Sequence, residues 1–213
     1  MKNMFTRATQ IFALSTALVC GGAQAALVTF EGFGANTIIG DENTGNGLQS
    51  VLSGGYSLTS SGDHFHLGSG LFGVPSNGTG ILLQDRNYAV TMTKVGGGAF
   101  DLLGADLGED VSFGASAMSI EITGFFSGGG SISTIFVLDG NASSFQNNLF
   151  AGFTNLSSVM FDGIGNPITG DEANGFTLDN ISVVDAAAVP EPGSLALLGL
   201  GLAGLAAVRR RKA

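Results

Sequence analysis

Alternating apolar and polar residues constrain the fold of this chain more than any other feature. In the stretch SAMSIEITGF, Met118, Ile120 and Ile122 occupy every second position, with polar residues between them. A period of two residues predicts a strand with one buried face. The same period occurs over residues 88–94 and 131–139. Apolar segments of this kind recur about every ten to fifteen residues, which predicts an all-β sandwich or barrel.

The composition favours short strands joined by tight turns. The 213 residues include 35 Gly and 16 Phe but no Trp, and only 12% are charged. Such a chain builds its core from Phe, Leu, Ile and Val. Two triple glycines, at residues 96–98 and 128–130, fit loops between strands because Gly adopts positive φ without penalty. Neither is followed by the Lys-Ser/Thr pair of a phosphate-binding loop.

The two ends of the central region, residues 26–186, resemble a known β-sandwich. VTFEGF begins at Val28, and FTLDNISVV begins at Phe176. An opening Phe-Glu-Gly and a closing Asp-Asn-Ile are similar to the ends of galactose-binding-like jelly rolls, the fold of many carbohydrate-binding modules and adhesins. The resemblance implies a jelly-roll-type β-sandwich.

The closing segment breaks its own alternation. Leu178 and Ile181 are three residues apart, where a regular strand would place two. One extra residue at Asp179-Asn180 predicts a β-bulge, and bulges re-aim side chains. We expect this bulge to turn Asp179 toward the first strand.

The N-terminal segment predicts export. A basic start and an apolar run over residues 11–19 precede the small residues Ala23 and Ala25. This order is typical of a secretory signal peptide, here residues 1–25, which signal peptidase removes. The mature chain would then begin at Ala26.

Cys20 is the only cysteine of the chain. Lipidation at this residue is an alternative to simple cleavage, but Val19 stands where a lipoprotein signal needs a small residue. Cleavage after Ala25 leaves a mature protein without a disulfide or a thiol nucleophile.

The C-terminal segment predicts a membrane anchor. Residues 195–208 form a continuous run of Leu, Ala, Gly and Val, which is short for a full span unless basic side chains snorkel. The basic residues that follow are Arg209, Arg210, Arg211 and Lys212. Such a cluster stays in the cytoplasm, so the body would lie outside.

The same segment resembles the PEP-CTERM sorting signal. The motif residues are Val189, Pro190, Glu191 and Pro192, and the apolar run and the Arg-rich tail follow in the order of that family. The resemblance implies a sorting segment over residues 187–213 that an exosortase of a Gram-negative bacterium recognises. It further implies transient anchoring in the inner membrane, cleavage near Pro-Glu-Pro, and delivery to the cell surface or the extracellular matrix.

Charge is distributed unevenly along the chain. The full chain has a net charge of −9. Within residues 26–188 only Arg86 and Lys94 are basic, against sixteen acidic residues, so this region has a net charge of −14. A body with this charge repels nucleic acid and anionic lipid, which excludes nucleic acid as a partner. Cations, neutral glycans and basic proteins remain as partners.

A structural calcium site is implied by the jelly-roll resemblance. In those modules a carboxylate after the first strand and one in the last strand often hold Ca²⁺, and the matching residues are Glu31 and Asp179. Asp63 and the carbonyl of Gly32 are further candidate ligands, because Ca²⁺ takes about six to eight oxygens. The alternative is that both carboxylates cap turns.

Two other patterns favour structural roles. Residues 41–47 begin like an EF-hand loop, but Gly45 and Leu52 replace required ligands, so we expect a plain turn. His64 and His66 share one face of a strand. Two ligands do not make a specific metal site, so we expect partly exposed strand residues.

No catalytic motif accompanies this fold. The chain contains neither a Gly-x-Ser-x-Gly elbow nor a His-Glu-x-x-His helix. Sugars usually stack on Trp or Tyr, and Tyr56 and Tyr88 are the only two such residues. We interpret the protein as an exported, non-catalytic surface or matrix protein associated with exopolysaccharide or biofilm. A carbohydrate-binding adhesin with structural Ca²⁺ and a glycan hydrolase are the alternatives.

Overall fold

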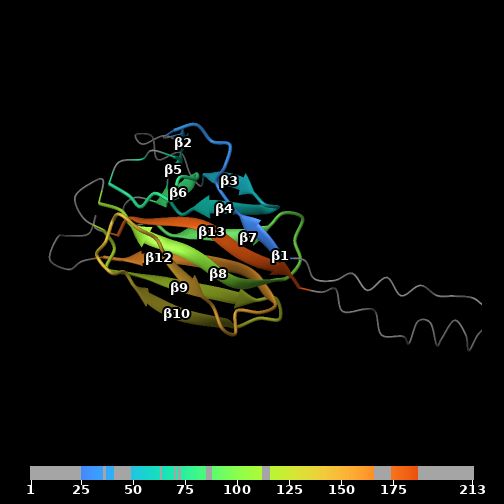
Figure 1. The fold of residues 1–213 in the computed structure, drawn as a ribbon. Helices are drawn as coiled ribbons and strands as arrows, with labels where there is room; N and C mark the ends of the chain where they lie inside the picture. The colour runs from blue at the N-terminus through green and yellow to red at the C-terminus, as the bar shows by residue number, and fades with distance from the viewer. Residues whose placement is uncertain are drawn as a thin grey trace, which may run out of the picture.

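The computed structural model describes residues 25–35, 37–40, 49–62, 64–69, 71, 73–84, 88–111, 116–165 and 174–186. The signal-peptide residues 1–24, the sorting segment from residue 187, the turn at residues 41–47 and Asp63 lie outside this part. Within it the chain forms thirteen strands and no helix (Figure 1). The strands are β1 Ala25–Val28, β2 Thr37–Gly40, β3 Ser50–Ser53, β4 Tyr56–Ser60, β5 His64–Gly68, β6 Ile81–Gln84, β7 Val90–Lys94, β8 Phe100–Glu109, β9 Ser119–Phe126, β10 Ser131–Val137, β11 Gln146–Leu149, β12 Leu156–Ile164 and β13 Phe176–Asp185.

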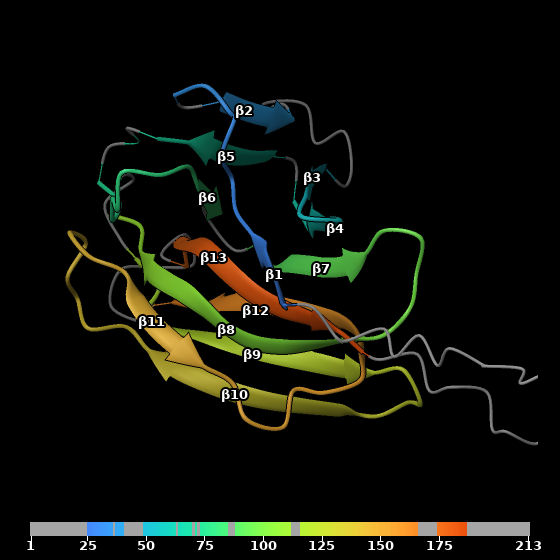
Figure 2. The ribbon, with the colours of Figure 1, turned by 45° about the vertical axis from the view of Figure 1, so that its right-hand side comes forward.

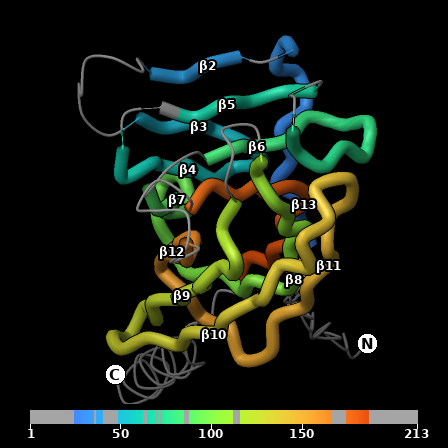
Figure 3. The backbone as a smooth tube through the Cα atoms, turned by 90° about the vertical axis from the view of Figure 1, so that its left-hand side faces the viewer, coloured from blue at the N-terminus to red at the C-terminus, as the bar shows by residue number. Residues whose placement is uncertain are grey.

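The strands pair antiparallel in two layers. The first layer, called sheet I, has the order β3-β4-β7-β12-β9-β10. The second, sheet II, has the order β2-β5-β6-β13-β8-β11, and β1 also pairs with β13. Among the described strands, one residue pair, Leu156 with Phe100, joins the two layers, and an isolated bridge between Ser116 and Gly175 links the segments before β9 and β13. Figure 3 shows β7, β12 and β9 on the left and β13, β8 and β11 on the right, so the predicted all-β sandwich is confirmed.

The core lies between the inner faces of the two sheets. Aromatic side chains fill much of it, and the fully buried ones are Phe30, Tyr56, Phe65, Phe100, Phe153, Phe161 and Phe176. Val90 and Met92 on β7 are fully buried and alternate with more accessible threonines, as their period predicts. Burial of apolar area at about 25 cal/mol per Å² therefore provides the main stabilisation of a body that, in its predicted mature form, has no cysteine.

The predicted burial of Met118 is wrong. Ile120 and Ile122 on β9 are fully buried, but Met118 is 52% exposed. The chain bends at Met118 before β9 begins at Ser119, and the Met118 amide donates to the carbonyl of Ile164. The bend turns the side chain out of the alternation that the two isoleucines follow.

The predicted bulge in the last strand is confirmed. The register between β13 and β8 shifts after Asp179, and Asn180 has a left-handed backbone with φ of 47°. On its other edge, β13 pairs with β6 as far as Leu178 and with β1 from Ile181. The bulge therefore lies where the last strand changes from one neighbour to the next.

Candidate functional site

Both carboxylates predicted as calcium ligands contact one segment, residues 77–80, which precedes β6. The Glu31 Oε1 atom accepts a hydrogen bond from the Gly80 amide at 3.2 Å. The Asp179 Oδ2 atom accepts one from Asn77 Nδ2 at 2.7 Å and one from Thr79 Oγ1 at 2.9 Å. The bulge thus directs Asp179 to this segment, which Glu31 also contacts.

The segment approaches the chain after β1 very closely. A Cβ atom on Gly80 would lie 2.1 Å from the carbonyl oxygen of Phe30. Real Cβ contacts are never this short, so only glycine fits between the segment and the Phe30 backbone. This close approach places the Gly80 amide next to Glu31.

Asp179 lies fully buried in a small polar network. Burial raises the pKa of its carboxyl, because the ionised form loses hydration, while hydrogen bonds from Asn77, Thr79 and the Asn180 amide oppose the rise. The carboxylate of Asp106, directly across on β8, raises the pKa further. Asp106 itself accepts hydrogen bonds from the side-chain amides of Asn180 at 2.9 Å and Asn147 at 2.8 Å.

The hydrogen bonds of Asp179 are those of a carboxylate that caps a turn and not those of a cation ligand. The oxygens of Asp179 receive N–H and O–H donors, whereas Ca²⁺ needs oxygen lone pairs directed at it. In the described part, no three His, Cys, Asp or Glu side chains gather closely enough to hold a metal ion. Asp63, the third candidate ligand, lies outside that part. Calcium at Glu31 and Asp179 stays a prediction.

The histidine and tyrosine positions differ from what a binding face needs. His66 is only 5% exposed, so its expected partial exposure is wrong. It lies opposite Leu83, which forms a second small core with Val74 and Ile81 on the outer face of sheet II. Tyr56 is buried against Phe100, with ring centroids 5.1 Å apart. Tyr88 is half-buried, and its ring occupies the space beside Gly62. Neither tyrosine offers an open stacking surface.

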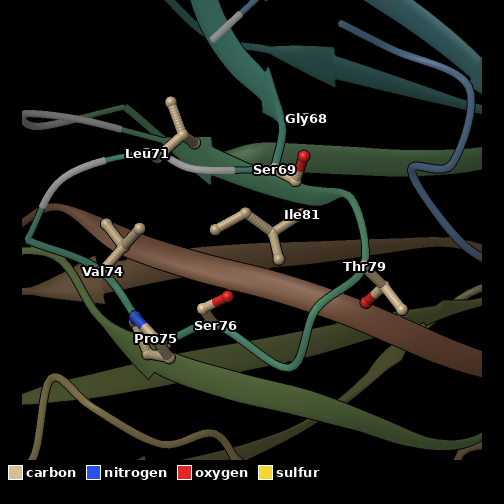
Figure 4. Close-up of a pocket in the computed structure, with 8 residues that line it drawn as sticks. All are labelled: Gly68, Ser69, Leu71, Val74, Pro75, Ser76, Thr79 and Ile81. Carbon is tan, nitrogen blue, oxygen red and sulfur yellow. The ribbon is translucent and has the colours of Figure 1, made fainter. Parts of the chain in front are cut away.

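A small pocket lies beside this second core. Figure 4 shows Leu71, Val74 and Ile81 around it, with Ser69, Ser76 and Thr79 supplying hydroxyl groups. The remaining lining residues, Gly68 and Pro75, are not ionisable either. The pocket is therefore lined by apolar side chains and hydroxyl groups and has no Asp, Glu, His, Lys, Arg, Cys or Tyr among its lining residues.

The two ends of the described chain lie next to each other. β1 pairs with the end of β13, with Ala25 opposite Val184, so both ends of the described chain lie at the same side of the sandwich in Figure 1. The Lys94 Nζ atom lies 2.8 Å from Asp185 Oδ1, and the Tyr56 hydroxyl donates to the same oxygen at 3.2 Å. The hydrogen bond from Lys94 is the main reason why the pKa of Asp185 is lowered. This cluster closes the last strand directly before the sorting segment.

One part of the outer face of sheet I carries mainly hydroxyl groups together with the exposed aromatic ring of Phe125. Two cross-strand rows run over it: Ser57, Thr93, Ser158, Phe125 and Ser131 in one, and Thr59, Thr91, Met160, Thr123 and Ser133 in the next. Phe125 is 38% exposed. Phe125 belongs to no sequence motif, and only its position in the alternation of β9 indicates that it lies on the outer face.

A carboxylate pair lies on the same face. Asp162 on β12 is directly opposite Glu121 on β9, with Ile135 of β10 next in the row. Burial raises the pKa of Asp162, and the charge of Glu121 adds to the rise. Like charges placed opposite each other in a sheet are destabilising, and here the higher pKa of Asp162 relieves part of the repulsion.

The C-terminal segment matches a known sorting signal. Residues 188–212 match the PEP-CTERM protein-sorting motif. The chain carries this sorting motif. The motif indicates export, anchoring at a membrane before processing, and recognition by an exosortase. No helix among the described residues is long and apolar enough to cross a membrane, and the predicted span at residues 195–208 lies outside them.

Solved carbohydrate-binding modules are distantly similar to the body. A mutant of CBM29-2, a family 29 module solved with mannohexaose, is 9% identical, covers 77% of this chain and 93% of its own, and has a TM-score of 0.37. A second CBM29-2 mutant is 10% identical, covers 77% and 92%, and has the same TM-score. A likeness this distant says nothing about a ligand of this chain. No curated protein sequence matches it.

Proposed function

We propose that this protein is an exported, non-catalytic component of the cell surface or extracellular matrix, associated with exopolysaccharide and released there by exosortase cleavage near Pro190–Pro192. The sorting motif at residues 188–212 is the observation that carries the proposal. The body supports it through what its surface offers: a part of sheet I that carries mainly hydroxyl groups and a pocket lined without ionisable side chains.

The position of the termini also supports the proposal. Asp185 is the last strand residue, and the sorting motif begins three residues later at position 188. An extended chain covers at most about 3.6 Å per residue, so the folded body would sit within about 25 Å of a cleavage site at Pro190–Pro192. A domain anchored this closely presents its opposite end to the outside.

Replacing Pro190 and Pro192 together with Ala tests the sorting step in the native host. We expect the variant to remain full-length in the membrane fraction, because the exosortase no longer recognises it. The unaltered protein should be found outside the membrane, beginning at Ala26 and ending near Pro190–Pro192 by mass spectrometry. Ser194→Ala, which changes the tail beside the motif, is the matched control and should be processed normally. An unaltered protein recovered outside the cell with Ala213 still in place would contradict the proposal.

A second candidate function, glycan binding, is favoured by Phe125. Its exposed ring lies between the hydroxyl groups of Ser131 and Ser158, and the Glu121–Asp162 pair lies on the same face. An aromatic face flanked by hydrogen-bonding groups is a common way to hold a sugar ring. A neutral glycan would also avoid the negative charge of the body.

Affinity electrophoresis through gels that contain the host exopolysaccharide tests this candidate. We expect the polysaccharide to retard the protein and Phe125→Ala to reduce the affinity about fivefold, since stacking contributes about 1 kcal/mol. The control is Leu52→Ala, which truncates an even more exposed apolar residue at the far edge of the same sheet. Equal retardation of both variants would exclude Phe125 as the binding surface.

A further inference from the structure

Strand β10 forms an open edge of sheet I. It pairs with β9 over all seven residues, Ser131–Val137, without a register shift. Among the described residues no strand pairs with its other side, and Figure 2 shows it as the outermost strand below β9. Its outward backbone N–H and C=O groups therefore offer a template for another strand.

The other sheet edges are short, as natural edges usually are. β2, β3 and β11, which end the two sheets elsewhere, have four residues each. β10 is longer and contains no charged residue and no proline, reading SISTIFV. Short length, charge, proline and bulges are the means by which proteins prevent edge pairing. β10 has none of them. The segment around Phe150 and Gly152 packs against the core-facing side chains of Phe136 and Ile132, but among the described residues no backbone hydrogen bond joins it to β10.

The side chains of β10 are incompletely covered on both faces. Ile132 and Phe136 point to the core but are only half-buried against it. On the outer face Ile135 is 56% exposed and Val137 is 74% exposed. Met118 and Ile164 extend this apolar surface beside Val137, at 52% and 39% exposure. A strand added at this edge would cover apolar area on both faces together.

We propose that β10 pairs antiparallel with β10 of a second copy of this chain, so that sheet I continues across a two-fold axis. Pairing around Thr134 would place Ile135 opposite Ser133 and Val137 opposite Ser131 of the other copy. Antiparallel partners share a face, so core-facing residues meet core-facing residues. The edge is thus complementary to itself, which is the condition for a two-fold interface.

The edge strand itself carries no charge, so repulsion between two copies comes only from carboxylates elsewhere in the body, where residues 26–188 have a net charge of −14. The nearest carboxylates, Glu121 and Asp162, lie on β9 and β12 and not on the edge strand. In the pair, the two Glu121 residues would be three strand spacings apart, or about 14 Å. The screening length at physiological salt is about 8 Å, so this repulsion is weak. An uncharged edge gives a basic protein no attraction of its own.

Sedimentation of the exported protein, isolated from its host, tests the pairing. We expect a monomer–dimer equilibrium, and Ile135→Lys should weaken it at least tenfold, because a lysine protects an edge. Leu52→Lys is the matched control: the same change at a 66% exposed residue on β3, the other edge of the same sheet. Circular dichroism confirms that both variants remain folded, since each replaced side chain is exposed.

Hydrogen exchange separates strand pairing from other contacts. The amides of residues 131–137 should exchange more slowly as protein concentration rises, whereas those of β3 should not change. A protein that stays monomeric, or a dimer that Leu52→Lys disrupts and Ile135→Lys leaves intact, would overturn the proposal. Slow exchange of β10 in a monomer would also overturn it, by showing that another segment of the same chain covers the edge. Sorting can succeed while pairing fails, so these outcomes are independent of the proposed function.

Discussion

At the residue scale, Asp179 shows how a buried carboxylate can serve as a structural cap. Its two oxygens accept hydrogen bonds from the side chains of Asn77 and Thr79 and from the Asn180 amide. These bonds hold the segment before β6 on the outer face of sheet II. Burial opposes the ionised form, so the stability that Asp179 contributes depends on pH.

Replacing Asp179 with Ala should lower the free energy of unfolding by about 2 kcal/mol, because buried donors lose their charged acceptor. A raised folded pKa means that the folded state binds the proton more tightly than the unfolded state. The contribution of Asp179 is therefore largest at low pH and declines as pH rises through the folded pKa. Urea unfolding at pH 4 and pH 7 measures both effects, and we expect the difference between the two proteins to be larger at pH 4.

Asp139→Ala is the control for this experiment, because Asp139 is an exposed carboxylate that also accepts a backbone amide. It should change stability by much less. Thermal unfolding of the unaltered protein and of Asp179→Ala, each with and without EDTA, tests the predicted calcium site at Glu31 and Asp179. A melting temperature that EDTA lowers in the unaltered protein but not in Asp179→Ala would support calcium; identical curves would exclude it.

At the element scale, the end of β13 is fixed by one cluster. Asp185 accepts a hydrogen bond from Tyr56 and forms an ion pair with Lys94, and the next residue, Ala186, donates its amide to the Ala99 carbonyl. Because Asp185 is exposed, this ion pair contributes little to global stability, about 0.2–1 kcal/mol. Its role is local: it holds the strand end from which the sorting segment departs.

Lys94→Met should therefore speed hydrogen exchange at residues 183–185 severalfold while hardly changing the melting temperature. The lowered pKa of Asp185 means that the stabilisation is present above the unfolded pKa and is lost as pH falls through the folded pKa. The two proteins should thus differ near pH 7 and converge in strong acid. Tyr56→Phe, which keeps the buried ring, is the comparison; a large fall in melting temperature for Lys94→Met would contradict a local role.

At the scale of the whole molecule, both ends of the described chain lie at one end of the sandwich. β1 and β13 lie side by side, so the chain enters and leaves at the same end, while β10 lies along a free edge (Figures 1 and 2). Anchoring and lateral pairing do not compete for the same surface.

Strict alternation made part of the fold predictable. Val90, Met92, Ile120 and Ile122 are buried as their period requires, and the extra residue after Leu178 is the bulge. Alternation failed at Met118, where a bend precedes the strand, and the expected partial exposure of His66 was wrong, since this residue lies opposite Leu83, a member of the second small core. Those outcomes depend on residues that are distant in sequence.

The sequence by itself determined the strands, the sandwich, the bulge and the sorting motif, because each is written in residues close together along the chain. Only the tertiary structure decided that Asp179 and Glu31 contact the same segment, that Tyr56 is buried, and that β10 ends a sheet. Each of these depends on which strands become neighbours. Local periodicity states that a strand has a buried face, but the packing of distant strands decides what that face meets and which edge is left open.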